Sequence, residues 1–169
     1  TGYGTHPVLK AADGTTGNDR FYVMALSNLS SSYYKWYYAA YNKGISDWST
    51  VTSQDFGTGK TNTATMISKW DNTAYGAQNA DSSYKDIWGE IKTKVANGWF
   101  VPSRAEWAAF GKAFDITSSN YSSTFGLSNY YWSSSLGSSS YAYCAGFNRG
   151  YIYNTNVIDY NYVRLATTF

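Results

Sequence analysis

The sequence predicts an α+β fold in which two or more helices pack beside a small, mostly antiparallel sheet. Two observations lead to this prediction. Amphipathic helical spacing is confined to residues 61–114, whereas the segments before and after it carry the aromatic and β-branched runs of strands. Strands and helices do not alternate along the chain, which argues against a parallel α/β sheet. The length of 169 residues fits a single domain spanning residues 1–169.

Two strands are predicted before the helical region. The run RFYVMALS at 20–27 lies between turn-forming residues, and the run YYKWYYAAY at 33–41 ends at Asn-Lys-Gly. The chain begins at a threonine in the manner of a cut fragment, so a leader or further N-terminal domains are compatible with this sequence.

Two helices follow from the spacing of apolar residues. The first is predicted over 63–70, after a capping Thr or Asn, and the second over 86–95, ended by Asn97-Gly98. The expected buried residues of the two helices are Ala64, Ile67 and Trp70, and Ile87, Trp88, Ile91 and Val95.

A third helix has the clearest local signal in the chain. A short apolar strand at 99–101 is stopped by Pro102, and Ser103 with Glu106 then forms a capping box. The helix continues to residue 114, with Trp107, Phe110 and Phe114 on its buried face.

The C-terminal segment reads as strands and turns. A strand at 143–148 is followed by a turn at 148–150, a short strand at 151–153, a turn at 154–156 and a last strand at 162–165. Alternation along the first of these strands predicts one scaffold face and one display face. The scaffold face would hold Tyr143, Ala145 and Phe147, and the display face Cys144, Gly146 and Asn148.

Composition excludes several classes of function. The net charge of +2 is too small for nucleic acid as the main partner, and no apolar run is long enough for membrane insertion. The single cysteine, Cys144, allows no internal disulfide and no cysteine-rich zinc site. His6 is the only histidine, so we expect no Ser-His-Asp relay, no metal and no cofactor.

The segment Gly57-Thr58-Gly59-Lys60-Thr61 superficially resembles a phosphate-binding loop. The full pattern requires glycine where this chain has Gln54. A turn followed by a helix cap explains the same residues, and this is the interpretation that we prefer.

Tyrosine is unusually frequent. Aromatic residues make up 20% of the chain, including 18 Tyr, while charged residues are only 14% against a usual value of about 25%. A surface rich in Tyr, Ser, Asn and Gly is typical of recognition surfaces such as antibody paratopes. A β-rich globule whose tyrosines fill its strands would have the same composition.

The last part of the chain lacks a specific set of residue types. Lys, Glu, Gln, Met and Trp account for 22 of the first 132 residues but are absent from residues 133–169. Under uniform composition this absence has a chance on the order of 0.001. None of the five types has a codon ending in C or T. A Ser/Tyr/Asn-rich sheet that excludes long side chains for packing reasons is the alternative explanation.

Four stretches together resemble the variable proteins of diversity-generating retroelements, and the resemblance covers residues 55–169, with 1–54 matching only loosely. The stretches are GWFVPSRAEWAAF (98–110), NYYWSSS (129–135), AGFNRGYIYN (145–154) and NYVRLATTF (161–169). The resemblance implies a C-type-lectin-like fold, in the branch shared with formylglycine-generating enzymes. It also implies that a reverse transcriptase rewrites the variable region, here 133–169, by misincorporation opposite template adenines. Scrambling the first two bases of AAC or AAT codons yields the fifteen residue types that remain.

This resemblance implies a ligand-binding protein that is not an enzyme. Its partner would be a protein or glycan on another cell or virus, met at a virion or cell surface. The expected ligand-binding, variable positions are Tyr141, Cys144, Gly146, Asn148, Arg149, Tyr151, Tyr153, Asn154, Thr155, Asn156, Ile158, Asp159 and Tyr160. The expected scaffold positions are Trp132, Ser133, Ser134, Tyr143, Phe147, Gly150, Val157, Val163 and Arg164.

Two alternatives stay open beside this reading. One is a lectin-fold adhesin or virion fibre domain with a fixed ligand. The other is an enzyme related to the formylglycine-generating or iron-dependent branch, although those enzymes use a cysteine pair or several histidines, and this chain has Cys144 and His6 alone. The Glu-Pro-Asn and Trp-Asn-Asp patterns of calcium-dependent sugar binding are also absent from the sequence.

Overall fold

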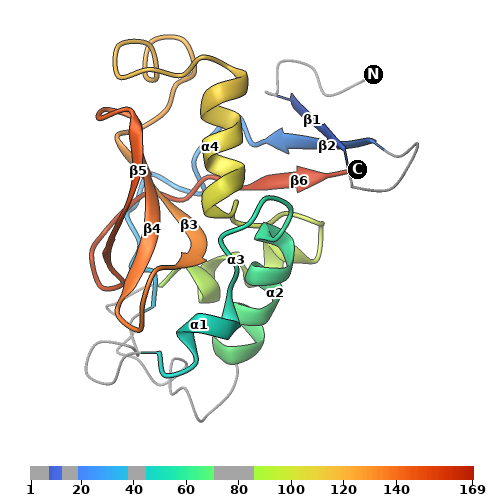
Figure 1. Ribbon diagram of the computed structural model, residues 1–169, viewed down its shortest axis with the longest axis vertical. Helices are drawn as coiled ribbons and strands as arrows, with labels where there is room; N and C mark the ends of the chain where they lie inside the picture. Colours follow the sequence, from blue (N-terminus) through green and yellow to red (C-terminus); the bar gives the residue numbers. More distant parts are fainter. Residues whose placement is uncertain (1–7, 13–18, 38–44, 71–85) are drawn as a thin grey trace.

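The computed structural model describes residues 8–12, 19–37, 45–70 and 86–169 and confirms the α+β class (Figure 1). The helices are α1 (Trp48–Val51), α2 (Gly59–Trp70), α3 (Ile87–Val95) and α4 (Arg104–Ala113). The strands are β1 (Val8–Ala12), β2 (Asp19–Met24), β3 (Tyr130–Leu136), β4 (Tyr141–Gly146), β5 (Tyr151–Asn156) and β6 (Ala166–Thr168). None of the helices in these ranges is long and apolar enough to cross a bilayer.

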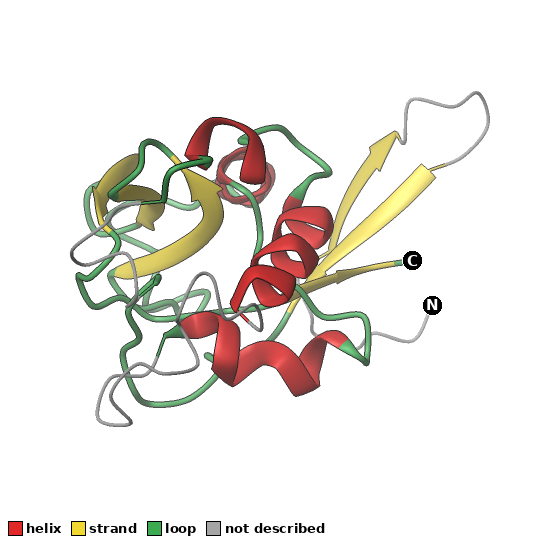
Figure 2. Cartoon of the chain, turned by 90° about the horizontal axis from the view of Figure 1, so that it is seen from below, coloured by secondary structure: helices red, strands yellow, loops and turns green. Residues whose placement is uncertain are grey.

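The strands form two separate antiparallel sheets, with α4 between them. One sheet has the order β1-β2-β6 and the other the order β3-β4-β5. Helix α4 contacts strands of both sheets, and the two sheets lie on opposite sides of the molecule in both views (Figures 1 and 2). The prediction of one small sheet is therefore too simple, because two short sheets share the central helix.

The sheet β1-β2-β6 joins the two ends of the described chain. The predicted strand at 20–27 is confirmed in β2, with shorter bounds, whereas the sequence did not predict β1 or β6. Ala166 of β6 pairs with Met24 and also forms a bridge with Phe100. The strand predicted at 99–101 is therefore reduced to this single bridge at Phe100.

Helices α3 and α4 follow their sequence signals closely. Asp86 caps α3 by accepting from the Gly89 backbone N–H. In α4 the predicted capping box is present: the Ser103 hydroxyl accepts from Glu106 N at 3.2 Å, and Ser103 N donates to the Glu106 carboxylate at 2.7 Å. The expected buried residues Ile87, Trp88, Ile91, Trp107 and Phe110 are buried, while Val95 and Phe114 are half-buried against the same clusters.

The other predicted elements need correction. Helix α2 starts four residues earlier than expected, and the residues that it buries include Asn62, Thr63 and Met66, whereas Ala64 is exposed. Asn62 faces inward because its side chain bonds to the backbone of Ser53 in both directions. The strand predicted at 33–41 is reduced to bridges at residues 34 and 35, and residues 38–41 lie outside the described part. Short α1 was not predicted, and the strand expected at 162–165 is a single bridge at Tyr162.

The glycine-rich segment is a turn and helix start, as expected, and it surrounds a carboxylate of the chain itself. Glu106 Oε1 accepts from Gly57 N at 3.1 Å and from Gly59 N at 3.4 Å, and Oε2 accepts from Ser103 N. Gly59 is required here because a Cβ at this position would clash with Glu106 Oε2 and would lie only 2.9 Å from the backbone atoms Ser103 N and Val101 O. The backbone donors at the start of α2 are thus used to hold α4 in place.

Three tryptophans anchor β3 to its neighbours through their indole N–H groups. Trp36 donates to Ser133 O at 2.7 Å, Trp107 to Trp132 O at 3.1 Å, and Trp132 to Tyr34 O at 2.7 Å. All three rings are buried, so each bond satisfies a donor that water cannot reach. Strand β3 is therefore held rigidly on both sides.

Candidate binding surface

Strand β4 is buried on both faces, which contradicts part of the predicted display face. Ala145 packs in a cluster with Trp107 and Phe147 under α4, while Cys144 packs with Trp132 and Val157 in the other cluster. The expectation that Cys144 is solvent-accessible is wrong, because the segments around 34–37 and 157–163 cover that side of the sheet. Burial also raises the pKa of the Cys144 thiol to about 11, so the thiol is protonated at neutral pH.

Gly146 is the second predicted position that is buried. Its strand partners are Tyr130 and Tyr151, and a Cβ added to it would lie 2.8 Å from Cε1 of Tyr153. Whether position 146 can hold a side chain therefore depends on the size of the residue at position 153. Of the predicted scaffold positions, Tyr143 is half-buried and Gly150 is exposed at a φ of +73°; the remaining seven are buried.

The accessible predicted positions lie along β5 and the turns at its two ends. Strand β5 hydrogen-bonds to β4 alone among the described strands, so it is the edge of its sheet (Figure 1). Tyr141 pairs with Asn156 across this edge. We call the following set the β5 surface: Tyr141, Asn148, Arg149, Tyr151, Tyr153, Asn154, Thr155, Asn156, Ile158, Asp159 and Tyr160.

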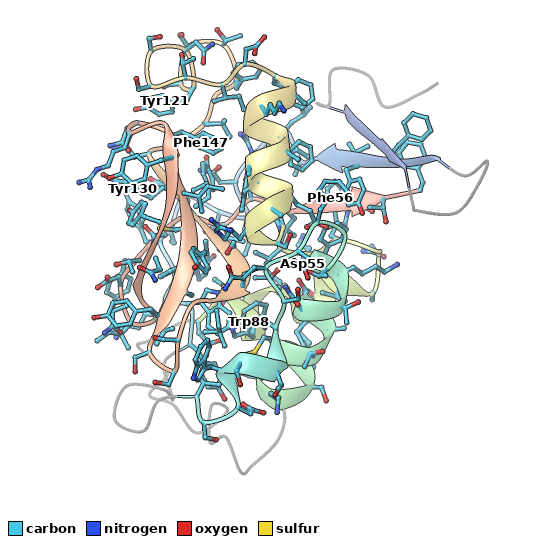
Figure 3. All side chains as sticks on the ribbon, viewed as in Figure 1. Asp55, Phe56, Trp88, Tyr121, Tyr130 and Phe147 are labelled. Carbon is cyan, nitrogen blue, oxygen red and sulfur yellow. The ribbon has the colours of Figure 1, made fainter. Side chains whose placement is uncertain are left out.

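At one end of the β5 surface, three tyrosines surround one arginine. The guanidinium of Arg149 lies 5.9 Å from the ring centroids of both Tyr130 and Tyr153, and its Nη1 donates to the Tyr151 hydroxyl at 3.3 Å. Asn148 Nδ2 donates to the Tyr130 hydroxyl at 3.0 Å. Figure 3 shows Tyr130 on the outer side of the sheet, with Phe147 nearer α4. We call Tyr130, Arg149, Tyr151 and Tyr153 the arginine cluster.

Sequence reasoning missed Tyr130 as a member of this surface. The residue lies before Trp132, and the codon pattern begins only after that tryptophan. Its ring is placed by the pairing of β3 with β4, which puts Tyr130 opposite Gly146 on the same side as Tyr151. The signal that could have indicated Tyr130 is its pairing, with Tyr151, to Gly146, which leaves room for both rings. This pairing can be recognised only when the strand register is known.

The other end of the β5 surface is held by a turn that the sequence placed too early. Residues 154–156 belong to β5, and the turn follows them. Asp159 accepts from Asn156 N at 3.2 Å and from the Thr155 hydroxyl, and Asn156 Oδ1 accepts from Ile158 N at 3.2 Å. The Lys35 ammonium lies 5.2 Å from the Tyr160 ring centroid.

A groove of about 610 Å³ lies between α4 and the sheet, beside the arginine cluster. Its apolar lining includes Trp107, Phe147 and Ile152, and Tyr151 forms part of its rim. Arg104 lies over the Tyr143 ring at 4.9 Å at this same side of the sheet. The tip of the β4–β5 hairpin therefore lies between an aromatic, cationic patch and a groove whose lining combines apolar residues with Arg104, Lys112 and Asp115.

The short distance between Gly146 and the Tyr153 ring leads to a prediction about stability. Gly146→Ala alone should lower the melting temperature, because the new methyl group meets the Tyr153 ring. In a Tyr153→Ser background the same change should have a much smaller effect. A thermal double-mutant cycle measures the coupling, and we expect about 1 kcal/mol or more. Additive effects of the two changes would contradict the predicted contact.

The described surface offers hydroxyls, amides, aromatic faces and one exposed guanidinium on a rigid sheet edge. Such groups suit recognition of a ligand by contact and hydrogen bonding. Comparisons of the chain with protein-family models, curated proteins and solved structures gave no match. The function is therefore inferred from the residues of the β5 surface and from the composition of residues 133–169.

Proposed function

We propose that this chain is a ligand-binding protein, not an enzyme, whose β5 surface is diversified by retroelement-driven adenine mutagenesis. We further propose that its α+β architecture is a variant of the C-type-lectin fold. The ligand would be a protein or glycan on another cell or virus, bound at a virion or cell surface. The motifs at 98–110, 129–135, 145–154 and 161–169 support both proposals.

The separation of core from surface within residues 133–169 carries the proposal. Of the thirteen positions expected to vary, Cys144 and Gly146 are buried, which leaves eleven with accessible surface. Interspersed scaffold residues such as Phe147, Val157 and Val163 are buried in the two core clusters. A segment in which accessible and buried residues alternate this closely can change its surface while it keeps its core.

A fixed-specificity lectin-fold adhesin is the second candidate, and the exposed tyrosines Tyr141, Tyr151 and Tyr160 favour it equally. Natural copies of the coding sequence distinguish the two candidates. Diversification predicts copies that differ only at C- or T-ending codons within 138–160, with a reverse transcriptase gene and a near-copy of the 3′ coding end nearby. An invariant segment without those neighbours would favour the adhesin.

The proposal also predicts that the β5 surface tolerates exchange. Replacing Tyr151, Asn154 and Tyr160 together with Ser, His and Asp should leave the melting temperature nearly unchanged, because all three are exposed. Exposed substitutions usually change stability by under about 0.5 kcal/mol each. Differential scanning calorimetry of a small set of such variants measures this. Asn156 is kept because its side chain caps the following turn.

A matched control uses a buried position within the same codon set. Cys144→Tyr obeys the codon rule, but its ring would have to enter the cluster of Trp132 and Val157. We expect this variant to be strongly destabilised or insoluble. Misfolding of most exposed-position variants, to the same degree as this control, would overturn the diversification proposal.

A further inference from the structure

Arg149 is an exposed cation that has no carboxylate partner among the residues that the structure describes. In the part of the chain that the structure describes, the contacts of its guanidinium are the three tyrosines of the arginine cluster. Asp159, the other charged residue of the β5 surface, is engaged by Thr155 and by Asn156 N at the far end of the strand. The tyrosine hydroxyl that accepts from Arg149 raises the pKa of its guanidinium, so the charge is permanent.

The three tyrosines of the arginine cluster contact the guanidinium from different sides and restrict its orientation. Tyr130 and Tyr153 are half-buried and lie beside the guanidinium. Tyr151 is 51% exposed, and its hydroxyl accepts a hydrogen bond from one guanidinium N–H group. An arginine has five N–H donors in a planar fork, so donors remain for a ligand after the bond to Tyr151. A fork fixed in this way loses little side-chain entropy when it pairs with a second group.

A carboxylate is the group that this fork matches best, because it accepts two parallel N–H bonds. The exposed ring of Tyr151 and the rim of the adjoining groove provide apolar contact for the residues beside it. The β5 surface holds one cation, Arg149, and one anion, Asp159, while Arg104, Lys112 and Asp115 line the adjoining groove, so within the arginine cluster itself a ligand meets a single positive charge. These features favour a single acidic side chain set among apolar neighbours.

We propose that the arginine cluster binds a glutamate or aspartate side chain of a protein ligand, with flanking apolar residues on Tyr151 and the groove rim. This inference rests on the proposed function and gives its ligand a chemical class. It treats Arg149 as the residue that pairs with the ligand and Tyr130 and Tyr153 as residues that position it. A sulfated glycan would need several cations and is treated as a competing outcome.

The test is a selection from a library of random twelve-residue peptides displayed on phage, with the immobilised chain as target. We expect enriched peptides to contain Glu or Asp next to an aromatic or aliphatic residue. The best peptide is then synthesised, together with its Glu→Gln form, and both are titrated by calorimetry. The Gln form should bind about tenfold more weakly, and the affinity should fall with added salt.

Arginine variants assign the contact. Arg149→Ala should weaken the peptide about tenfold or more, and Arg149→Lys should recover only part of this loss because an ammonium has no planar fork. Lys60→Ala is the control, since Lys60 is also an exposed cation but lies on α2, outside both the β5 surface and the groove. We expect this variant to bind within about twofold of the unmodified chain, because it leaves the arginine cluster intact.

Three outcomes would overturn the inference. Enriched peptides that lack acidic residues but lose affinity on Tyr151→Ala would leave the proposed binding surface intact and remove only its preference for acids. Peptides indifferent to both Arg149 and Tyr151 would count against the β5 surface as well. Arg149-dependent retention on immobilised heparin, without enrichment of acidic peptides, would assign the cluster to sulfated glycans.

Discussion

Replacing Glu106 with alanine is expected to lower the free energy of unfolding by about 3–5 kcal/mol. The carboxylate is buried and accepts from the backbone N–H groups of Gly57, Gly59 and Ser103. Alanine leaves all three donors without their partner and removes the bonds by which Gly57 and Gly59, at the start of α2, are joined to α4. Urea denaturation followed by tryptophan fluorescence measures the loss.

Two further variants test the cause of this effect. Glu106→Gln keeps one acceptor oxygen but turns an amide N–H₂ toward a backbone donor, so we expect a smaller loss of about 1–3 kcal/mol. Glu90→Ala removes the only other glutamate, in the first turn of α3, where we expect a loss of up to about 1 kcal/mol. An equal loss in Glu90→Ala and Glu106→Ala would contradict a special role for Glu106.

The pH dependence of stability gives a second measurement on Glu106. Burial raises the pKa of Glu106 above its ordinary value of 4.5, although the N–H donors oppose this shift. A raised folded-state pKa stabilises the fold below the unfolded-state pKa, and this contribution is lost as pH rises through the folded-state pKa. Relative to Glu106→Gln, the unmodified chain should therefore become less stable as pH increases from 4.5 upward.

Phe147→Ala is expected to lower stability by about 3–5 kcal/mol, because it opens a cavity in the cluster under α4. The ring of Phe147 lies 5.7 Å from Trp107 and 6.0 Å from Tyr131, centroid to centroid, and is 7% exposed. Phe147 also joins β4 to the hairpin turn, so its loss should loosen the support of the arginine cluster. Urea melts of the variant give the difference directly.

Tyr151→Ala is the matched control for Phe147→Ala. It removes an aromatic ring four residues away on the same hairpin, but that ring is 51% exposed. Its effect should stay below about 1 kcal/mol. Similar losses in the two variants would mean that the hairpin does not divide into a buried and an exposed part as described.

Local signals predicted the local structure of this chain well. The capping box of Ser103 and Glu106, the helix after Asp86 and the strand at β2 each depend on residues within one or two turns of each other. The turn at Gly57 and the capping box were both visible in the sequence. Their meeting was not, because Glu106 and Gly57 are 49 residues apart and nothing local links them.

The candidate site was predicted less completely for the same reason. Alternation along β4 indicates two faces, but it does not show that α4 covers one and the segments near Trp36 and Val163 cover the other. Cys144 was therefore assigned to the surface when it belongs to the core. Tyr151 and Asn154 of β5 are exposed as expected, because an edge strand has few neighbours that could cover them, whereas Tyr153 and Asn156 are half-buried.

The place of β6 has a consequence for biosynthesis. Ala166 lies between Met24 and Phe100, and the Phe169 ring stacks on Phe21 at a centroid distance of 5.5 Å. The contacts with Met24 and Phe21 join residues 166–169 to residues that lie more than 140 positions earlier in the chain. The domain can complete this sheet only after β6 has left the ribosome, so a premature stop or frameshift upstream of β6 yields a chain in which β2 lacks this partner strand.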